Sequence, residues 1–203
     1  MLPTSTTIPT TTTTTVPEYH FSIHQVDVAG LAHSWHEGCP VDPEDLRRID
    51  LVHHDFTGVV GEGSIIVHER YAEDIARVFG RLFDAGYPIV SVIPIGELPE
   101  GAEDQPGYVN TSGFHCRFVE GTTRWSEHAL GAAIDINVHV NPYIRGDYLW
   151  PQGSERYLDR TLGEPGMIVE GDAVVDAFDD IGWGWGGRWQ SSKDYQHFSA
   201  SGH

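Results

Sequence analysis

Two residues that could bind a metal, His128 and Asp135, stand seven positions apart with a glycine between them, and this spacing restricts how the chain can fold. On one straight strand the two side chains would point to opposite faces, and on one helix they would lie about 10 Å apart along the axis. A turn must therefore intervene, and Gly131 is the residue that permits it. We expect His128 on a loop or helix end, and Asp135 on a strand over residues 132–138.

A second pair near the C-terminus, Asp194 and His197, meets the same restriction. Their separation of three positions would point the two side chains to opposite faces of a single strand. We therefore expect Asp194 in a turn, followed by a short strand over residues 196–199 that carries His197.

His128, Asp135 and His197 supply two imidazoles and one carboxylate. This set holds a catalytic zinc ion and leaves a fourth position open for water, and a further unligated carboxylate such as Asp194 can then act as the base. The pattern thus predicts one zinc ion in a hydrolase. With twelve histidines in the chain, a chance pair near an acid is the competing interpretation, in which the side chains are solvated or make ordinary hydrogen bonds.

Three stretches of the sequence carry a resemblance to a known family. They are S-x-H-x-x-G-x-A-x-D at residues 126–135, W-G-W-G-G-x-W at 183–189 and D-Y-x-H-F at 194–198. Together they resemble the zinc D-alanyl-D-alanine carboxypeptidase family, which includes D,D-peptidases and L-alanyl-D-glutamate endolysin peptidases. Upstream, residues 110–117 and 38–40 resemble a secreted bacterial subgroup of that family.

The resemblance implies roles for individual residues. His128, Asp135 and His197 would bind the zinc ion, and Asp194 would be the general base. Arg117 would bind a substrate carboxylate or the developing oxyanion, although its context F-H-C-R differs from the S-x-Y-R of many relatives.

Two further residues are candidates for substrate contact. Ser126 is a polar neighbour of His128 and is expected to support it through a hydrogen bond. Trp185 belongs to a group with Trp183 and Trp189 that fits either the core or the wall of a cleft, and we expect Trp185 to contact the substrate.

The substrate that the resemblance implies is a peptidoglycan stem peptide, cleaved either at a D-Ala-D-Ala end or at L-Ala-D-Glu. Two alternatives remain. One is a binding module that keeps the zinc site without catalysis, as the signalling domain of hedgehog proteins resembles this site. The other is a general zinc dipeptidase.

Charge and composition limit partners and location. A net charge of −18, with Lys193 the single lysine against eleven arginines, argues against nucleic acid. No apolar run is long enough for a transmembrane segment, and the first residues have no signal-peptide pattern. Residues 1–17 are rich in Thr and Pro and predict a disordered linker, typical of an exported or cell-wall-associated protein whose signal was removed. We expect a monomer with one peptidase domain over residues 18–203.

Hydrophobic patterning predicts several elements. Asp42 and Pro43 are typical of a helix start, residues 63–67 and 87–95 of strands, and residues 97–107 of a polar loop. Residues 69–85 and 172–181 show helical periodicity. The mixture predicts an α+β fold with a small, mainly antiparallel sheet flanked by helices.

Cys39 and Cys116 are the only cysteines. An even count in an apparently exported chain permits a disulfide, and the alternative is two buried thiols. We favour the bridge, which would tether the segment that carries Arg117 to the N-terminal part of the domain.

Overall fold

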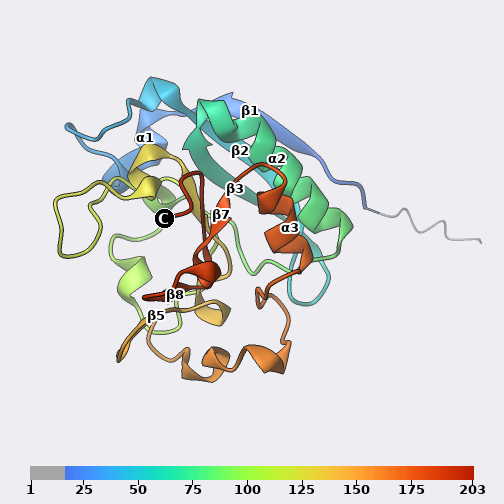
Figure 1. Ribbon diagram of the computed structural model, residues 1–203. Helices are drawn as coiled ribbons and strands as arrows, with labels where there is room; N and C mark the ends of the chain where they lie inside the picture. The colour runs from blue at the N-terminus through green and yellow to red at the C-terminus, as the bar shows by residue number, and fades with distance from the viewer. Residues whose placement is uncertain (1–16) are drawn as a thin grey trace, which may run out of the picture.

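The computed structural model describes residues 17–203, so the predicted linker lies outside it except for Pro17. In this part of the chain, helices combine with three small sheets in which every strand pairing is antiparallel (Figure 1). This confirms the α+β class. The strands are divided among three sheets rather than joined in one, because those after residue 130 have only two or three residues each and cannot extend a continuous ladder.

The first sheet has the order β1 (Phe21–Gln25), β2 (Leu46–His54), β3 (Val60–His68). The strand predicted at 63–67 lies within β3. The helix start predicted at Asp42 and Pro43 is corrected, because a single 3-10 turn there, η2 (Pro43–Asp45), leads directly into β2. Buried side chains along β2, such as Ile49 and Leu51, explain why the strand continues.

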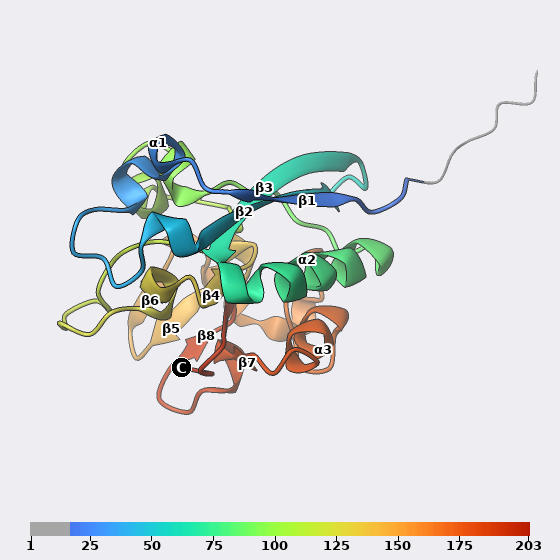
Figure 2. The ribbon, with the colours of Figure 1, turned by 90° about the horizontal axis from the view of Figure 1, so that it is seen from above.

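Two helices stack beneath this sheet. Helix α2 (Glu69–Asp84) confirms the helix predicted at 69–85, and it is followed by Gly86 with a positive φ of 64°. Helix α3 (Ala173–Asp179) confirms the prediction at 172–181, and the Asp172 carboxylate caps it by accepting two backbone N–H groups. In the view from above, α2 lies between the first sheet and α3 (Figure 2).

The other two sheets lie on the far side of the core from the first sheet. One has the order β4 (Ala133–Asp135), β9 (His197–Ser199), β7 (Gly184–Trp185). The other has the order β6 (Tyr148–Trp150), β5 (Tyr143–Arg145), β8 (Lys193–Asp194). Segments far apart in sequence therefore meet here.

The strand predicted at residues 87–95 is wrong, because the segment makes only isolated bridges at Pro88 and Val92. Pro88 has no N–H to donate to a ladder. Side-chain amides replace a neighbouring strand elsewhere: the N–H of Val90 donates to Asn137, and that of Ile93 donates to Asn110. The periodicity of apolar residues in a sequence does not reveal hydrogen bonds to side chains of this kind.

The remaining helices are short. They are α1 (Val28–Leu31), η1 (Ala32–Ser34), η3 (Ile95–Glu97), η4 (Ala102–Asp104), η5 (Glu127–Leu130), η6 (Val138–Val140), η7 (Glu155–Leu158), η8 (Arg160–Leu162) and η9 (Gly186–Arg188). Two of the 3-10 turns, η3 and η4, interrupt the segment predicted as a loop at 97–107. None of the helices within residues 17–203 has the length and apolar character needed to cross a membrane.

One hydrophobic core joins these layers. It contains Ile65 from the first sheet, Phe79 from α2 and Phe178 from α3. It also contains Ile134 and Phe198, which lie on β4 and β9 next to the candidate metal ligands. The strands that carry the ligands are therefore fixed by close packing.

Candidate metal centre

The turn that the sequence required between His128 and Asp135 is present. Helix η5 carries His128, and Ser126 caps its start by accepting the His128 backbone N–H at 3.3 Å. Gly131 ends it with a left-handed φ of 60°. A Cβ at Gly131 would lie 2.5 Å from the backbone nitrogen of His68, so only glycine fits.

Asp135 and His197 face each other across two paired strands. Asp135 ends β4 and is the register partner of His197 on β9. Directly opposite residues of an antiparallel pair have their Cβ atoms about 5 Å apart, so both side chains can reach one ion. The predicted strand at 132–138 is shorter than expected because Asn137 has a positive φ of 49°.

The expected position of Asp194 needs a correction. Asp194 lies on β8 rather than in a turn, and it pairs with Tyr143 of β5 in a different sheet from His197. The chain passes from one sheet to another at residues 195–196, so Asp194 and His197 do not share a strand. Their side chains are therefore not forced to opposite faces of one strand.

The three candidate ligands form a compact triangle of donor atoms. His128 Nε2 lies 3.3 Å from His197 Nδ1 and 3.2 Å from one oxygen of Asp135. The other Asp135 oxygen lies 2.9 Å from His197 Nδ1. Ligand atoms about 2.0–2.1 Å from a tetrahedral zinc ion are separated by about 3.3 Å, so this donor set fits that metal.

The imidazoles are oriented by the protein. His128 Nδ1 lies 2.7 Å from the carbonyl oxygen of Gly113, to which it can donate, and this leaves Nε2 free to bind a metal. The side chains of His128 and His197 are only 5% and 8% exposed, against 14% for Asp135. The ligand atoms are therefore held in a buried, preformed arrangement.

Asp135 is suited to binding a cation. Burial alone would raise the pKa of its carboxyl group, but the charge and hydrogen bonds of His128 and His197 lower the pKa by more. The group is therefore ionised at neutral pH, as a metal ligand must be.

The pKa of Asp194 is shifted in the opposite direction. Burial raises its pKa to about 7, and the negative charge of Asp135 adds to this, while His197, Gln196 and Arg117 act to lower it. One of its oxygens, Oδ1, is buried and has no hydrogen-bond partner among the described residues. A carboxyl group that titrates near neutral pH and has a free oxygen is suited to proton transfer.

Arg117 lies near enough to this group for its charge to act on Asp194 and His197. Its side chain is exposed, and no carboxylate within residues 17–203 lies within 4.0 Å of its guanidinium nitrogens. Its backbone carbonyl accepts the N–H of Ser126 at 3.1 Å, which ties it to the start of η5.

The structure places Trp185 in the core rather than at the site surface. Its side chain packs with Phe198, and its Nε1 donates to the carbonyl oxygen of Tyr195 at 2.9 Å. Because both the ring and the donor are engaged, Trp185 acts as a packing residue in this structure, and we remove it from the candidate substrate contacts.

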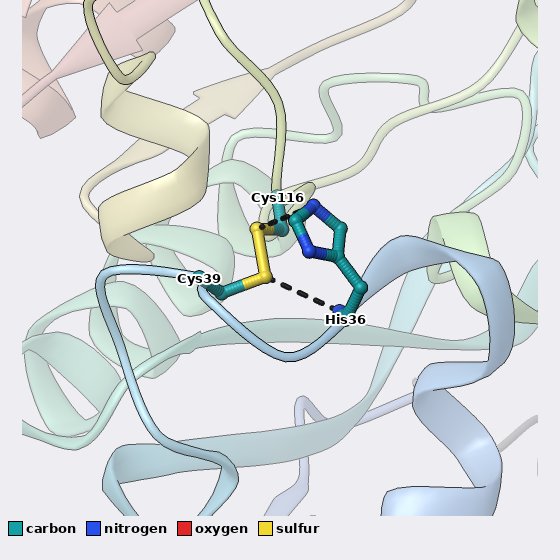
Figure 3. A group of neighbouring side chains, drawn as sticks. All are labelled: His36, Cys39 and Cys116. Atoms are coloured by element: carbon teal, nitrogen blue, oxygen red, sulfur yellow. Dashed lines mark hydrogen bonds between the residues drawn. A yellow bond between two sulfur atoms is a disulfide. The ribbon is translucent and has the colours of Figure 1, made fainter.

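Cys39 and Cys116 are joined in a disulfide (Figure 3). His36 lies against it: its backbone N–H donates to Cys39 Sγ at 3.2 Å, and its ring nitrogen Nε2 lies 3.6 Å from Cys116 Sγ. The three residues form a second group of metal-binding type, but both sulfurs are used in the bridge. Because thiolate is the form that binds metals, this group is a cross-link rather than a second metal centre.

Sequence reasoning missed two kinds of participant. The carbonyl of Gly113 belongs to the backbone, so no side-chain motif could have indicated it. Glu103, which lies 3.6 Å from His115 Nδ1, comes from a loop whose only sequence signal was its polarity. Folding alone brings Gly113 to His128 and Glu103 to His115.

Comparison with known proteins supports the identity of this site. Residues 120–200 match the model of a family described as D-alanyl-D-alanine carboxypeptidase, and the matched segment contains His128, Asp135, Asp194 and His197. It spans about two fifths of the chain and excludes Arg117 and both cysteines. Searches of curated proteins and of solved structures gave no significant match.

The match agrees with the resemblance seen in the motifs, and over residues 120–200 the chain is similar to this family. Together with the buried His128–Asp135–His197 group, which could hold a metal ion, this similarity supports a hydrolytic peptidase.

Proposed function

We propose that this protein is a zinc metallopeptidase that hydrolyses stem peptides of peptidoglycan, as a D-Ala-D-Ala carboxypeptidase or an L-Ala-D-Glu endopeptidase. The observation that carries the proposal is the buried triangle of His128, Asp135 and His197 beside the partnerless oxygen of Asp194. The description of the matching family supports the substrate class.

His128, Asp135 and His197 would hold the ion. A zinc ion supplies Lewis acidity at such a site, polarising a carbonyl group and lowering the pKa of water. The protein contributes the fixed orientation of the ligands, through the Gly113 contact to His128 and the strand pairing of Asp135 with His197.

Asp194 would accept a proton from water and pass it to the leaving amine. Its pKa of about 7 makes both charge states accessible near neutral pH. A divalent cation at the neighbouring ligands would lower this pKa, which favours the ionised form that the first proton transfer requires.

Arg117 would bind a carboxylate of the substrate or the developing oxyanion. An exposed guanidinium with no carboxylate partner in the described chain is free to form the bidentate pairs that such groups favour. Ser126 supports His128 as a cap, and contact of its hydroxyl with substrate remains a prediction.

The rival interpretation is a zinc-bearing binding module without catalysis. Asp194 argues against it, because a purely structural site does not need a buried carboxylate that lacks a partner and titrates near neutrality. The second rival, a general zinc dipeptidase, shares all of this chemistry and differs only in its substrate.

We further propose that the protein acts as a monomer outside the cytoplasm, secreted or bound to the cell wall. The Cys39–Cys116 disulfide supports an oxidising compartment.

Incubation of the metal-loaded protein with defined muropeptides, followed by mass analysis of the products, tests the function. We expect cleavage at one of the two bonds, and none after the metal is removed by a chelator. Cleavage of free dipeptides alone would favour the dipeptidase. Absence of cleavage across a broad panel, with the metal bound, would favour the binding module.

A further inference from the structure

One face of the sheet β6–β5–β8 carries large side chains in a row that begins at Asp194. Tyr143 on β5 is the register partner of Asp194 on β8 and of Trp150 on β6. Two residues further along β5, Arg145 pairs with Tyr148. Residues directly opposite each other in an antiparallel pair share a face, as do residues two apart on one strand. The five side chains therefore lie on one face of the sheet, beside the candidate base.

The aromatic rings on this face contact one another. The centroids of Tyr143 and Tyr148 are 6.0 Å apart, and the two rings meet edge to face. Tyr108, from the loop after η4, adds a ring whose centroid lies 6.2 Å from that of Trp150. Tyr148 is 48% exposed, and the other three rings are half-buried. A contiguous row of accessible aromatic side chains that adjoins a candidate active site is typical of a ligand-binding surface.

The chemistry of the face limits what it can bind. The rings supply apolar surfaces, while the tyrosine hydroxyls and the exposed guanidinium of Arg145 supply hydrogen-bond donors. A sugar ring has the matching combination, with C–H groups across its flat side and hydroxyl oxygens around its edge. An anionic polymer would need several cations, and Arg145 is the only cationic side chain in this row. The face therefore fits a neutral sugar better than a charged polymer.

The distance from Asp194 suits a sugar that is attached to the scissile peptide. Two residues of a strand span about 7 Å, so the Arg145–Tyr148 pair lies about that far along the sheet from Tyr143 and Asp194. An extended peptide spans about 3.5 Å per residue. In a muropeptide, a single L-Ala stands between the sugar and the L-Ala–D-Glu bond. A sugar can therefore reach Tyr148 while that bond lies at Asp194.

We propose that the face formed by Tyr143, Tyr148 and Trp150 binds the N-acetylated amino sugar to which the stem peptide is attached. This rests on the proposed peptidase function and deepens it, because it makes the substrate a muropeptide rather than a free peptide. It also favours cleavage at L-Ala–D-Glu over D-Ala–D-Ala, a bond that lies several residues further from the sugar.

Calorimetry on the full chain carrying Asp194→Asn, loaded with zinc, tests this face without turnover. Three probes share one stem peptide that begins with L-Ala–D-Glu. The first carries the amino-sugar disaccharide at its N-terminus, the second an acetyl group and the third a benzoyl group. The sugar-bearing probe should bind about three- to tenfold more tightly than either of the others, a gain of the size of one aromatic contact.

Adding Tyr148→Ala should remove this gain and leave the affinities of the acetylated and benzoylated probes within about twofold. Tyr148→Phe keeps the ring and should retain most of the gain. Phe21→Ala is the matched control, because Phe21 is an aromatic residue of β1, in another sheet, with a similar exposure of 41%. It should not change the affinity of any probe.

Equal affinity for the sugar-bearing and acetylated probes would overturn the proposal, as would a loss in Tyr148→Ala that is the same for all three probes. A gain for the benzoylated probe equal to that for the sugar would indicate a general apolar surface and would also overturn it. Failure of all three probes to bind would do the same. Metal-dependent cleavage of the acetylated peptide by the wild type can succeed in each of these cases, so failure of the sugar-binding face is distinguishable from failure of the proposed function.

Discussion

At the scale of single residues, Asp194 is the residue that distinguishes an enzyme from a metal-binding module without catalysis. An unsatisfied buried polar group costs about 1–3 kcal/mol, and more when it is charged. The Oδ1 atom of Asp194 is such a group, and the fold holds it beside His197. A stability cost maintained next to candidate metal ligands indicates a role in chemistry.

Replacing Asp194 with asparagine tests this role. Because Asp194 is not a ligand, Asp194→Asn should retain zinc and fold, yet lose roughly two to four orders of magnitude in turnover of a cleaved muropeptide. Activity of the wild type should fall as the pH drops below the pKa of Asp194, since the base must be ionised. Turnover by the variant equal to that of the wild type would refute the assignment.

The sequence was enough to name the functional side chains, but it did not predict the groups that surround them. His128, Asp135, Asp194 and His197 could be named because few residue types bind zinc or transfer protons at such spacing. The contact between Glu103 and His115 could not be predicted, because it depends on how a polar loop folds.

At the scale of elements, long periodic segments were predictable and short ones were not. Helices α2 and α3 follow an apolar stripe, and β3 an apolar run. By contrast, β4 and β9 have three residues each, which is too few for a period to show. Residues 87–95 have the composition of a strand, but side-chain amides of Asn110 and Asn137 take the place of a neighbouring strand.

The turn after η5 is the element on which the metal centre depends most. Gly131→Ala should destabilise the fold by about 1–3 kcal/mol through its positive φ, with a further cost from the contact with His68. It should also weaken zinc binding by displacing His128. Chemical denaturation and metal content measure the two effects.

Gly146→Ala is the matched control for that variant. Gly146 has a φ of 58°, and a Cβ there would meet nothing within 4 Å. Gly146→Ala therefore measures the cost of the positive φ alone, without a steric contact. Equal destabilisation by the two variants, with zinc retained in both, would mean that the close approach to His68 does not position His128.

At the scale of the whole molecule, the site is assembled from distant segments. The disulfide links residues 77 positions apart and holds the N-terminal part of the domain against the segment that carries Arg117. The sequence permitted this pairing because only two cysteines exist, whereas the approach of His36 to the bridge could not be predicted.

Cys39→Ser should lower the free energy of unfolding by about 4 kcal/mol, since a cross-link that closes so long a loop mainly restricts the unfolded chain. Substrate affinity should also fall, because Arg117 follows Cys116 directly. His36→Ala, which keeps the bridge, is the control. Unchanged stability of Cys39→Ser would show that packing alone fixes these segments.

The central claim is that His128, Asp135 and His197 hold one catalytic zinc ion, and metal content tests it most directly. Elemental analysis of the purified protein, after zinc loading and removal of free metal, should give about one equivalent per chain. His128→Ala and His197→Ala should each lose most of it while Asp194→Asn keeps it. Zinc content in both histidine variants equal to that of the wild type would contradict the account.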